Sequence, residues 1–377
     1  MKIIFTCGGT AGHVNPALAL ASLIRERQSD SEILFVGARR GIERRLIEEA
    51  GWPFRAVEVS SFHRSLKPKE IRHNLISVKN FLRCGAEARS LLDEFCPDLV
   101  VGTGGYASYP VVREAAKRGI PTAIHESNAI PGLTTKLLEK HAQLIMVGFE
   151  ECRANYKNPE KVMVTGTPVR SDFFALSRSE AKKTLGMDDG RPIIVSFWGS
   201  LGAGAMNRCI ADFMALETKE RKFHHVHGAG VVGCRVMSEY LAETGIDLTG
   251  TPELEVREYI SDMGTLMRAA DLVISRAGAS TISELTALGV PAIIVPSPNV
   301  ANNHQEHNAR VLADAGGAVM IREEDCDALR LYETVCSILG DENRRSAMSA
   351  AMSSLGTIDS AERIYRAVMA LCKKSSK

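Results

Sequence analysis

The sequence predicts an α/β protein made of two doubly wound parallel sheets, and three observations lead to this fold class. Short runs rich in β-branched residues alternate with amphipathic stretches along the chain, which is typical of strand–helix–strand units. These runs are continuously apolar, as expected for strands that are covered on both faces. The length of 377 residues is more than one hydrophobic core usually holds, so two domains are expected.

Seven candidate strands occupy the first half of the chain. Each is followed by a helical pattern or a loop, and in an open α/β sheet these following turns are where ligands bind. We assign residues 1–165 to this N-terminal domain. The predicted strands are Ile3–Thr6, Ile33–Val36, Ala56–Val59, Leu99–Val101, Thr122–Ile124, Leu144–Val147 and Val162–Val164.

The same alternation restarts after residues 166–174, whose sequence is GTPVRSDFF. Residues 170–191 are charged and poor in strand formers, which predicts a linker with a short helix. We assign residues 166–355 to a C-terminal domain, and the last helical pattern, within residues 356–377, could pack on either domain. The predicted strands are Ile193–Phe197, His224–His227, Leu254–Val256, Leu272–Ser275, Ala292–Val295 and Ala318–Ile321.

The composition excludes several classes of protein. A net charge of +1 argues against binding of nucleic acid over the whole surface. Nine cysteines without a CxxC pair favour reduced thiols over a disulfide framework or a zinc site. Since no apolar run resembles a signal peptide or a membrane span, a soluble or at most peripheral protein is expected.

The first glycine turn, TCGGTAGHVNP at residues 6–16, follows the first predicted strand. It does not match the dinucleotide fingerprint, because the first glycine is replaced by Cys7 and no acidic residue ends the second strand. It does not match GxxxxGK[ST] either. What remains is a glycine turn that leads into a helix started with the help of Pro16, and the N-terminus of such a helix attracts anions.

His13 lies at the far edge of this turn. One interpretation is a residue at a helix end that only bonds a nearby carbonyl, and the other is a catalytic imidazole. The position on a turn of the phosphate-binding type favours the catalytic interpretation.

Two polar motifs follow later strands of the first half. Residues 101–110, VGTGGYASYP, combine a second glycine turn with the hydroxyls of Thr103 and Tyr106. A tight turn required only by packing is the structural alternative. Residues 125–132, HESNAIPG, place four hydrogen-bonding side chains in a row, which suggests a site for a polar ligand, although contacts within the loop could account for some of them.

Two further glycine turns follow strands of the second half. Residues 196–207, SFWGSLGAGAMN, have the arrangement of a second phosphate-binding turn. In residues 275–289, SRAGASTISELTALG, Thr281 and Glu284 match a capping box, which would explain both residues structurally. The functional alternative is that Ala279–Thr281 offer amides to a pyrophosphate while Glu284 accepts hydrogen bonds from ribose hydroxyls.

Amides and imidazoles are enriched near the end of the second half. Asn303 and Gln305 are uncharged donors and acceptors, which suits sugar hydroxyls. His225 and His227 alternate along one strand, but because no other metal-ligand spacing accompanies them, buried structural histidines are expected.

Taken in order, the motifs GGTAGH, GTGGYASYP, HESN, GTPVR, GSLGA, EYISDM and RAGASTISE resemble those of glycosyltransferase family 28, over roughly Met1 to Ala350. The resemblance implies the GT-B fold, two Rossmann-like domains that face a deep cleft, with a final helix that returns to the first domain. It also implies transfer of N-acetylglucosamine from UDP-N-acetylglucosamine to the C4 hydroxyl of the N-acetylmuramic acid in lipid I, which gives lipid II.

The resemblance also implies binding residues by position. The acceptor would meet Gly104, Gly105 and Tyr106. The donor would be bound by Thr10, Ala11, Gly12, Asn128, Arg170, Ser200, Ile260, Ala279, Ser280, Thr281, Glu284 and Gln305.

An inverting transfer of this kind needs a base for the acceptor hydroxyl. His13 is the candidate, with Glu126 behind it. The departing UDP gains charge, which the helix end at Ala279–Thr281 would stabilise. We expect no metal cofactor, because the sequence has no convincing Asp-x-Asp pair.

Three positions depart from the family pattern. Ala11 stands where the first turn often has glycine, and Ser127 stands where glutamine is commoner. The family's paired glutamines are His304 and Gln305 here, which leaves the role of His304 open.

The implied acceptor is a lipid, so a membrane-facing surface is expected. Residues 61–90 hold seven Lys/Arg against two Glu, and Ile71, Leu75, Val78 and Leu82 recur at helical spacing beside Arg72, Lys79 and Arg83. An apolar stripe edged by basic residues suits an anionic bilayer, although an ordinary core-facing helix has the same pattern. The resemblance implies a peripheral protein on the cytoplasmic side of a bacterial membrane, with other cell-wall synthesis proteins as further partners.

Two other functions remain open at this point. One is a UDP-N-acetylglucosamine 2-epimerase of the same fold, which would need no basic apolar stripe. The other is a non-catalytic subunit that binds nucleotide-sugar or recruits partners, against which His13 and two complete domains on one chain argue.

Overall fold

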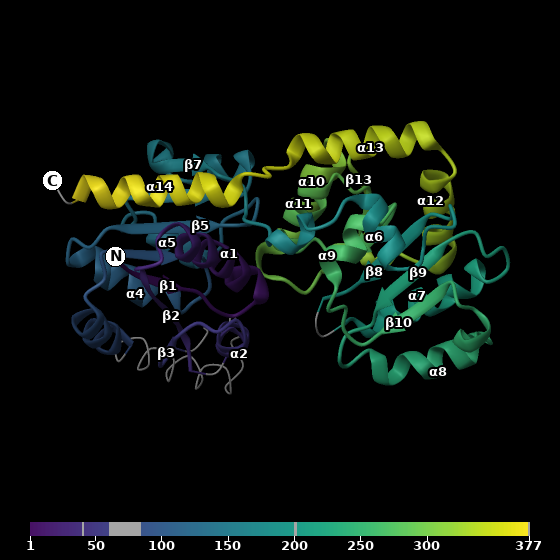
Figure 1. Cartoon of the computed structure of the whole chain (residues 1–377), viewed down its shortest axis with the longest axis horizontal. Helices are drawn as coiled ribbons and strands as arrows, with labels where there is room; N and C mark the ends of the chain where they lie inside the picture. The colour runs from purple at the N-terminus through teal and green to yellow at the C-terminus, as the bar shows by residue number, and fades with distance from the viewer. Residues whose placement is uncertain (40, 60–83, 200–201, 376–377) are drawn as a thin grey trace. The chain divides into compact units, whose positions relative to one another are not determined.

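A computed structural model describes residues 1–39, 41–59, 84–199 and 202–375, and the chain divides into two compact units (Figure 1). Unit 1 consists of Met1–Val169 together with Thr357–Lys377, and unit 2 consists of Arg170–Gly356. The boundaries expected after residues 165 and 355 fall close to these divisions.

Unit 1 is built on a seven-stranded parallel sheet with the order β3-β2-β1-β4-β5-β6-β7. Strand β1 lies between β2 and β4, so that Ile3 is paired with Ile33 on one side and with Leu99 on the other. The strands are β1 (Lys2–Thr6), β2 (Glu32–Ala38), β3 (Phe54–Val57), β4 (Leu99–Gly102), β5 (Thr122–Glu126), β6 (Leu144–Val147) and β7 (Val162–Val164).

Helices cover both faces of this sheet, which explains why its strands are continuously apolar. Ile4 belongs to the core on one face, while its neighbours Ile3 and Phe5 belong to the core on the other. Residues 84–95 are also helical. The helices and 3-10 turns are α1 (Ala11–Arg27), α2 (Ile42–Glu49), α4 (Ser108–Lys117), α5 (Leu133–Leu138), α14 (Ser360–Ser375), η1 (Glu150–Asn155) and η2 (Pro159–Lys161).

The last helix of the chain packs on unit 1. Ile364 and Val368 of α14 are buried in the same core as Val14 and Leu20 of α1, and the helix runs alongside unit 1 in Figure 1. Ser360 Oγ donates a 3.1 Å hydrogen bond to the carbonyl of Thr167, which joins the start of α14 to the last residues of the first segment of unit 1.

Unit 2 repeats the architecture with a six-stranded parallel sheet of order β10-β9-β8-β11-β12-β13. Its strands are β8 (Ile193–Phe197), β9 (His224–Gly228), β10 (Leu254–Arg257), β11 (Leu272–Ser275), β12 (Ala292–Ile294) and β13 (Ala318–Met320). Its helices and 3-10 turns are η3 (Ser171–Phe174), α6 (Arg178–Thr184), α7 (Gly204–Glu217), α8 (Cys234–Thr244), η4 (Leu248–Gly250), α9 (Met263–Ala269), α10 (Ala279–Leu288), η5 (Ala301–Asn303), α11 (His304–Asp314), η6 (Glu323–Asp325), α12 (Ala328–Leu339) and α13 (Glu342–Leu355).

The predicted fold class is confirmed, and each of the thirteen predicted strands overlaps an observed one. Strand β3 differs most from its prediction, because it begins at Phe54 instead of Ala56. Phe54 is paired with Phe35 of β2, and this pairing extends the strand toward its start. After Val57 the chain turns away, with Val59 N bonded to Val57 O.

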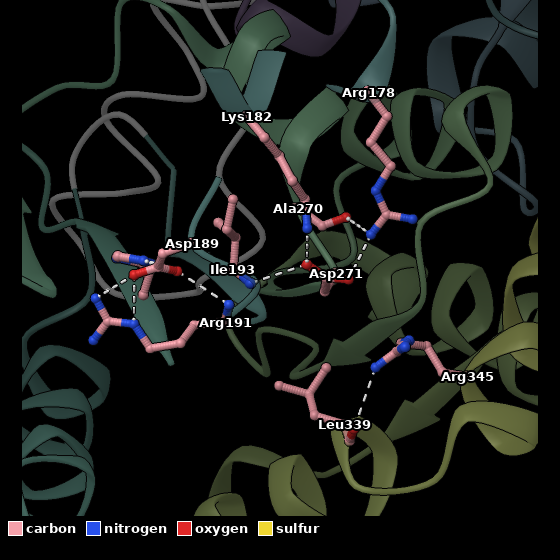
Figure 2. A network of polar contacts seen from close by, with 10 residues as sticks. Arg178, Lys182, Asp189, Arg191, Ile193, Ala270, Asp271, Leu339 and Arg345 are labelled. Atoms are coloured by element: carbon pink, nitrogen blue, oxygen red, sulfur yellow. Dashed lines mark hydrogen bonds and ion pairs between the residues drawn. The ribbon is translucent and has the colours of Figure 1, made fainter. Parts of the chain in front are cut away.

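The segment at residues 170–191, predicted as a linker with a short helix, is part of unit 2 and contains the short helix α6. Asp271, whose side chain is 9% exposed, holds it in place (Figure 2). Its carboxylate is paired with Arg178 at 2.6 Å and with Lys182 at 2.8 Å, and it accepts a 3.0 Å hydrogen bond from the amide of Ile193 at the start of β8.

Some expectations fall on residues that lie outside the described ranges. These are Ser200 and the basic apolar stripe with Ile71, Arg72, Leu75, Val78, Lys79, Leu82 and Arg83. Among the residues that the structure does describe, none of the helices combines the length and the apolar character needed to cross a bilayer.

We predict that Asp271→Ala lowers the free energy of unfolding of unit 2 by about 1–3 kcal/mol, because a buried amide and two cations lose their acceptor. Denaturant unfolding followed by Trp198 fluorescence in a Trp52→Phe background measures this. Asp212→Ala, which removes a partly exposed partner of Arg208, is the matched control and is expected to cost less than about 1 kcal/mol. Equal effects of the two substitutions would contradict the anchoring role.

Candidate functional site

The glycine turns lie at the carboxyl ends of two adjacent strands in each sheet. In unit 1 the strand order reverses between β1 and β4, which are followed by the turns at residues 7–10 and 103–107. In unit 2 it reverses between β8 and β11, which are followed by the turns at residues 198–203 and 276–278. Ligands of open α/β sheets bind beside such reversal points. Each unit therefore carries one candidate half-site.

The two glycine turns of unit 1 touch through their backbones. Gly105 has a φ of +81°, and a Cβ atom there would overlap the carbonyl group of Gly8. Thr103 Oγ1 donates a 2.6 Å hydrogen bond to the carbonyl oxygen of His13. The predicted acceptor residues, including Tyr106, therefore belong to a turn that lies directly against the first glycine turn and the start of α1, where His13 lies.

The hydrogen bonds of His13 determine which ring nitrogen carries the proton. Nδ1 lies 2.7 Å from the carbonyl oxygen of Gly8, which can only accept, so Nδ1 is protonated. The neutral ring then has its lone pair on Nε2. A Cβ atom on Gly104 would come within 2.9 Å of Nε2, so this position must lack a side chain. The half-buried imidazole is thus arranged to accept a proton at Nε2.

The predicted donor residues Thr10, Ala11 and Gly12 form the N-terminal end of α1. The helix begins at Ala11, so Pro16 lies in its second turn and does not help to start it, contrary to the prediction. Because proline has no N–H group, the carbonyl of Gly12 has no helical donor. Thr10 is the N-cap residue and its side chain makes no cap hydrogen bond. The amides of this first turn attract anions.

Glu126 organises the loop that carries Asn128. One carboxylate oxygen accepts from the backbone amide of Asn128 at 3.0 Å and from its side chain at 2.9 Å. The other accepts from the Gly132 amide at 2.9 Å and from Thr135 Oγ1 at 2.6 Å. Both oxygens are engaged within this loop and not with His13. We therefore assign Glu126 a structural role in presenting Asn128, in place of the expected role behind the base.

His125 and Ser127 are buried structural residues of the same motif. His125 Nε2 donates a 2.9 Å hydrogen bond to the carbonyl of Gly166, and Ser127 Oγ lies 3.4 Å from His125 Nδ1. Burial lowers the pKa of His125, so its ring is neutral. The hydrogen bond from His125 to Gly166 joins β5 to the segment that follows β7.

The capping-box interpretation of Thr281 and Glu284 is wrong. Helix α10 begins at Ala279 with Gly278 as its N-cap residue, and no side chain caps it. Thr281 therefore lies in the first turn. Ser280 Oγ is buried and has no hydrogen-bond partner among the described residues. The first-turn amides and this unpaired hydroxyl together make a site suited to an anion.

Glu284 lies in the second turn of α10 and does not serve as a cap. Loss of hydration raises the pKa of its carboxyl group to about 8; the nearby Arg170 opposes this shift and Asp172 adds to it. Arg170 is paired with Asp172 at 3.1 Å and lies over the Phe173 ring at 5.4 Å. Hydroxyl donors from a ligand would stabilise the carboxylate form of Glu284.

The third glycine turn packs against the end of β9. A Cβ atom on Gly202 would overlap the carbonyl of Ala229, so the two backbones meet as they do in unit 1. Two predicted donor residues lie in other segments of unit 2, Ile260 in the loop after β10 and Gln305 as the second residue of α11. The side chain of Ile260 is buried against Gly228, which leaves only its backbone for a ligand. The side-chain oxygen of Gln305 accepts a 2.9 Å hydrogen bond from the Ser297 amide, so the side-chain nitrogen of Gln305 points away from Ser297.

His225 and His227 belong to a buried chain of hydrogen bonds, as expected for structural histidines. Asn207 Nδ2 donates to the carbonyl of Ala229 at 2.9 Å, so its oxygen accepts from His227 Nε2 at 3.2 Å. His227 Nδ1 accepts from Ser196 Oγ at 2.7 Å, and Ser196 in turn accepts from His225 Nε2 at 2.7 Å. Across the described residues no group of three His, Cys, Asp or Glu side chains is arranged to hold a metal ion.

The chain of hydrogen bonds ends in the pair of His225 and Glu217, which shares a proton. His225 already donates from Nε2, yet its Nδ1 lies 2.7 Å from Glu217 Oε2. A proton must therefore lie between them, on the ring or on the carboxyl group. The hydrogen bonds run from this pair to the Ala229 carbonyl, on which Gly202 also packs. It thus supports the third glycine turn from within the core.

Sequence reasoning missed Glu43, Thr103 as a support of His13, and Asn207. Glu43 is fully buried and bonds the first glycine turn. The sequence does carry a signal for the burial of Glu43, since the glycines at positions 37 and 41 leave space for a side chain from the start of α2. Asn207 and Thr103 carry no comparable signal, because their hydrogen-bond partners lie far away in the sequence.

Two family models match the chain. The model of the glycosyltransferase family 28 N-terminal domain matches residues 3–147, and that of the glycosyltransferase family 28 C-terminal domain matches residues 193–364. A protein of Acetivibrio thermocellus named UDP-N-acetylglucosamine–N-acetylmuramyl-(pentapeptide) pyrophosphoryl-undecaprenol N-acetylglucosamine transferase is 40% identical, covering 100% of both chains. The protein of the same name from Bacillus licheniformis is 36% identical, covering 98% of this chain and 99% of its own.

Solved structures agree with these matches. The crystal structure of Acinetobacter baumannii MurG is similar with a TM-score of 0.74 and 25% identity, covering 98% of this chain and 99% of that chain. The UDP-GlcNAc 2-epimerase of Neisseria meningitidis has a TM-score of 0.66 at 15% identity, covering 98% of this chain and 100% of that chain. The latter likeness shows the fold alone.

We predict that the buried ring of His227 makes unit 2 lose stability in acid. Burial lowers its pKa in the folded state to about 3, with His225 adding to the shift, from an ordinary value of 6.5. Below about pH 6.5 the unfolded chain takes up a proton that the folded chain does not, so the free energy of unfolding falls by up to about 1.4 kcal/mol per pH unit on this account.

Denaturant unfolding between pH 7 and pH 4 measures this slope. In His227→Gln the contribution disappears and the pH dependence flattens, whereas His307→Gln, at an exposed position of α11, serves as the control for removal of a histidine. An unchanged slope in His227→Gln would contradict the prediction.

Proposed function

The chain belongs to glycosyltransferase family 28, and from this premise we propose that it transfers N-acetylglucosamine from UDP-N-acetylglucosamine to the N-acetylmuramyl-pentapeptide of lipid I, which gives lipid II. Relatives of 36% and 40% identity over nearly the whole chain are named as transferases for this reaction. The motif resemblance and the two matching family domains agree with it. The 2-epimerase alternative rests on likeness of fold alone.

The observation that carries the mechanism is the orientation of His13. In an inverting transfer, the acceptor C4 oxygen attacks C1 of the donor sugar in one displacement while the bond from C1 to the phosphate oxygen breaks. The attacking hydroxyl must lose its proton, and the lone pair of His13 Nε2 takes it, since Nδ1 is held protonated by the Gly8 carbonyl. Gly104, Gly105 and Tyr106 form the adjacent acceptor surface.

The half-site of unit 2 binds the nucleotide and stabilises the leaving group. UDP departs with additional negative charge, which the first-turn amides at Ala279–Thr281 and the unpaired hydroxyl of Ser280 accept. Glu284 accepts from the ribose hydroxyls, and Arg170 lies near it. This chemistry requires no resident metal cofactor, because the helix end and the hydroxyl supply the compensating charge and hydrogen bonds.

The acceptor is attached to undecaprenyl pyrophosphate, so the protein acts at a membrane surface. We assign it to the cytoplasmic face of the bacterial membrane as a peripheral protein, with the basic apolar sequence pattern from Ile71 to Arg83 as the part that binds the membrane and other cell-wall synthesis proteins as partners. The names of the relatives, which specify an undecaprenol-linked acceptor, support this assignment.

The test of the function is transfer of labelled N-acetylglucosamine from UDP-N-acetylglucosamine to a lipid I analogue by the full chain. We expect the wild-type protein to transfer label and His13→Ala to lose about 100-fold or more in kcat. Donor affinity in His13→Ala is expected to stay within about twofold, because the imidazole acts on the acceptor.

His307→Ala, on the surface of unit 2, is the matched control and keeps full activity. Absence of transfer by the wild-type protein with UDP-N-acetylglucosamine still bound would favour a non-catalytic binding subunit. Equal losses in kcat and donor affinity would remove His13 from the role of base.

Glu284→Ala is expected to weaken binding of UDP-N-acetylglucosamine by about 10-fold or more, because the ribose hydroxyls lose their acceptor. In the wild type the affinity should rise with pH through about 8, since the hydroxyls favour the carboxylate form and binding releases a proton. Titration calorimetry at several pH values measures both effects. Loss of thermal stability without loss of affinity would contradict the assignment.

A further inference from the structure

A fully buried carboxylate supports the first glycine turn. Glu43, the second residue of α2, is 0% exposed and pairs with no cation among the described residues. Its Oε2 accepts a 3.2 Å hydrogen bond from the amide of Gly9, and its Oε1 accepts a 2.9 Å hydrogen bond from the amide of Ala38. The side chain therefore joins the turn after β1 to the end of β2.

The surrounding backbone is shaped to hold this side chain. A Cβ atom on Gly8 would lie 2.9 Å from Glu43 Oε1, and one on Gly37 would lie 2.7 Å from Glu43 Cγ. A Cβ atom on Gly41 would overlap the carboxylate itself. Three glycines from three different segments thus leave the space that one carboxylate fills. A negative charge at this place also raises the pKa of Tyr106, in addition to the larger effect of burial.

The amide that Glu43 binds and the carbonyl that His13 binds belong to the same peptide group. The Gly8–Gly9 peptide turns its N–H toward Glu43 Oε2 and its C=O toward His13 Nδ1, 2.7 Å away. In a planar trans peptide these two groups point in opposite directions. The carboxylate therefore lies on one side of the peptide and the imidazole on the other.

We propose that Glu43 is a positioning residue that selects the tautomer of His13 by holding the orientation of the Gly8–Gly9 peptide. This inference rests on the proposed function, in which His13 Nε2 is the base. Glu43 does not touch the reacting atoms, and it acts through the peptide.

The alternative orientation of the Gly8–Gly9 peptide shows why its orientation must be held in place. Glycine on both sides, with Gly9 at a φ of +87°, makes rotation of the peptide easy. A rotated peptide would direct the Gly9 N–H at His13 Nδ1, so the ring would carry its proton on Nε2 and could not accept one there. It would also direct the Gly8 carbonyl at the Glu43 carboxylate, and two acceptors that face each other repel. The buried carboxylate thus excludes the inactive tautomer.

The variant that tests the proposal is Glu43→Gln, in the full chain. Glutamine keeps the size of the side chain but offers one oxygen, so the two amides can no longer both be accepted. We expect kcat to fall about 10- to 100-fold, as happens when a metal-ligating histidine loses the partner that orients its ring. The KM for UDP-N-acetylglucosamine is expected to stay within about twofold. Glu48→Gln, on an exposed position of the same helix, is the matched control and keeps wild-type kcat.

Nitrogen-15 NMR of histidine-labelled protein provides a readout that a merely structural role would not change. Well above the ordinary imidazole pKa, the shifts distinguish a protonated from an unprotonated ring nitrogen, and His13→Ala identifies the signals of His13. In the wild type we expect the proton on Nδ1. In Glu43→Gln we expect a mixture with the Nε2–H form.

The outcomes separate the two proposals. A wild-type ring protonated on Nε2 overturns the role of Glu43 even if Glu43→Gln does not fold. Loss of kcat with an unchanged tautomer, or an unchanged kcat, overturns it as well. If His13→Ala keeps full activity, the assignment of the base fails, while the NMR measurement still decides whether Glu43 sets the tautomer.

Discussion

The direct contact of backbone with backbone at the point where each strand order reverses is the constraint on which the rest of the structure depends. In unit 1 Gly105 lies on the carbonyl of Gly8, and in unit 2 Gly202 lies on the carbonyl of Ala229. Any side chain at either glycine would separate the segments. Because the turns approach this closely, short polar groups such as Thr103 Oγ1 reach backbone atoms of the neighbouring turn and fix its conformation.

Buried polar side chains then convert these contacts into defined orientations. Each such group must satisfy its hydrogen bonds within the protein, and a group that is satisfied in only one geometry holds its neighbours in that geometry. Glu43 accepts from an amide of the first glycine turn, Glu126 accepts from the side chain of Asn128, and Asn207 donates to the carbonyl of Ala229. None of these side chains needs to touch a substrate, yet together they determine where the reactive groups point.

The two half-sites differ in their electrostatics. In unit 1 the carboxylate of Glu43 accepts from the Gly9 amide from inside the protein, and the His13 imidazole lies on the other side of the same peptide. In unit 2 the first turn of α10 has no side-chain cap, and Ser280 Oγ has no partner among the described residues. An internal anion suits the proposed transfer of a proton to unit 1, whereas unpaired donors suit the proposed binding of a diphosphate to unit 2.

The sequence by itself determined the strand–helix alternation, the two domains, the glycine turns and the family, because continuous apolar runs and ordered motifs are local features. It also made His13 a candidate base, because its place directly after a glycine turn is readable from neighbouring residues. It could not tell that Thr281 is not a helix cap, that Glu126 is saturated within its own loop, or that Glu43 lies behind the first turn. Those facts depend on distances between segments far apart in the chain. Only the tertiary structure decided them, since the order of strands in the sheet determines which turns meet and which buried groups find partners.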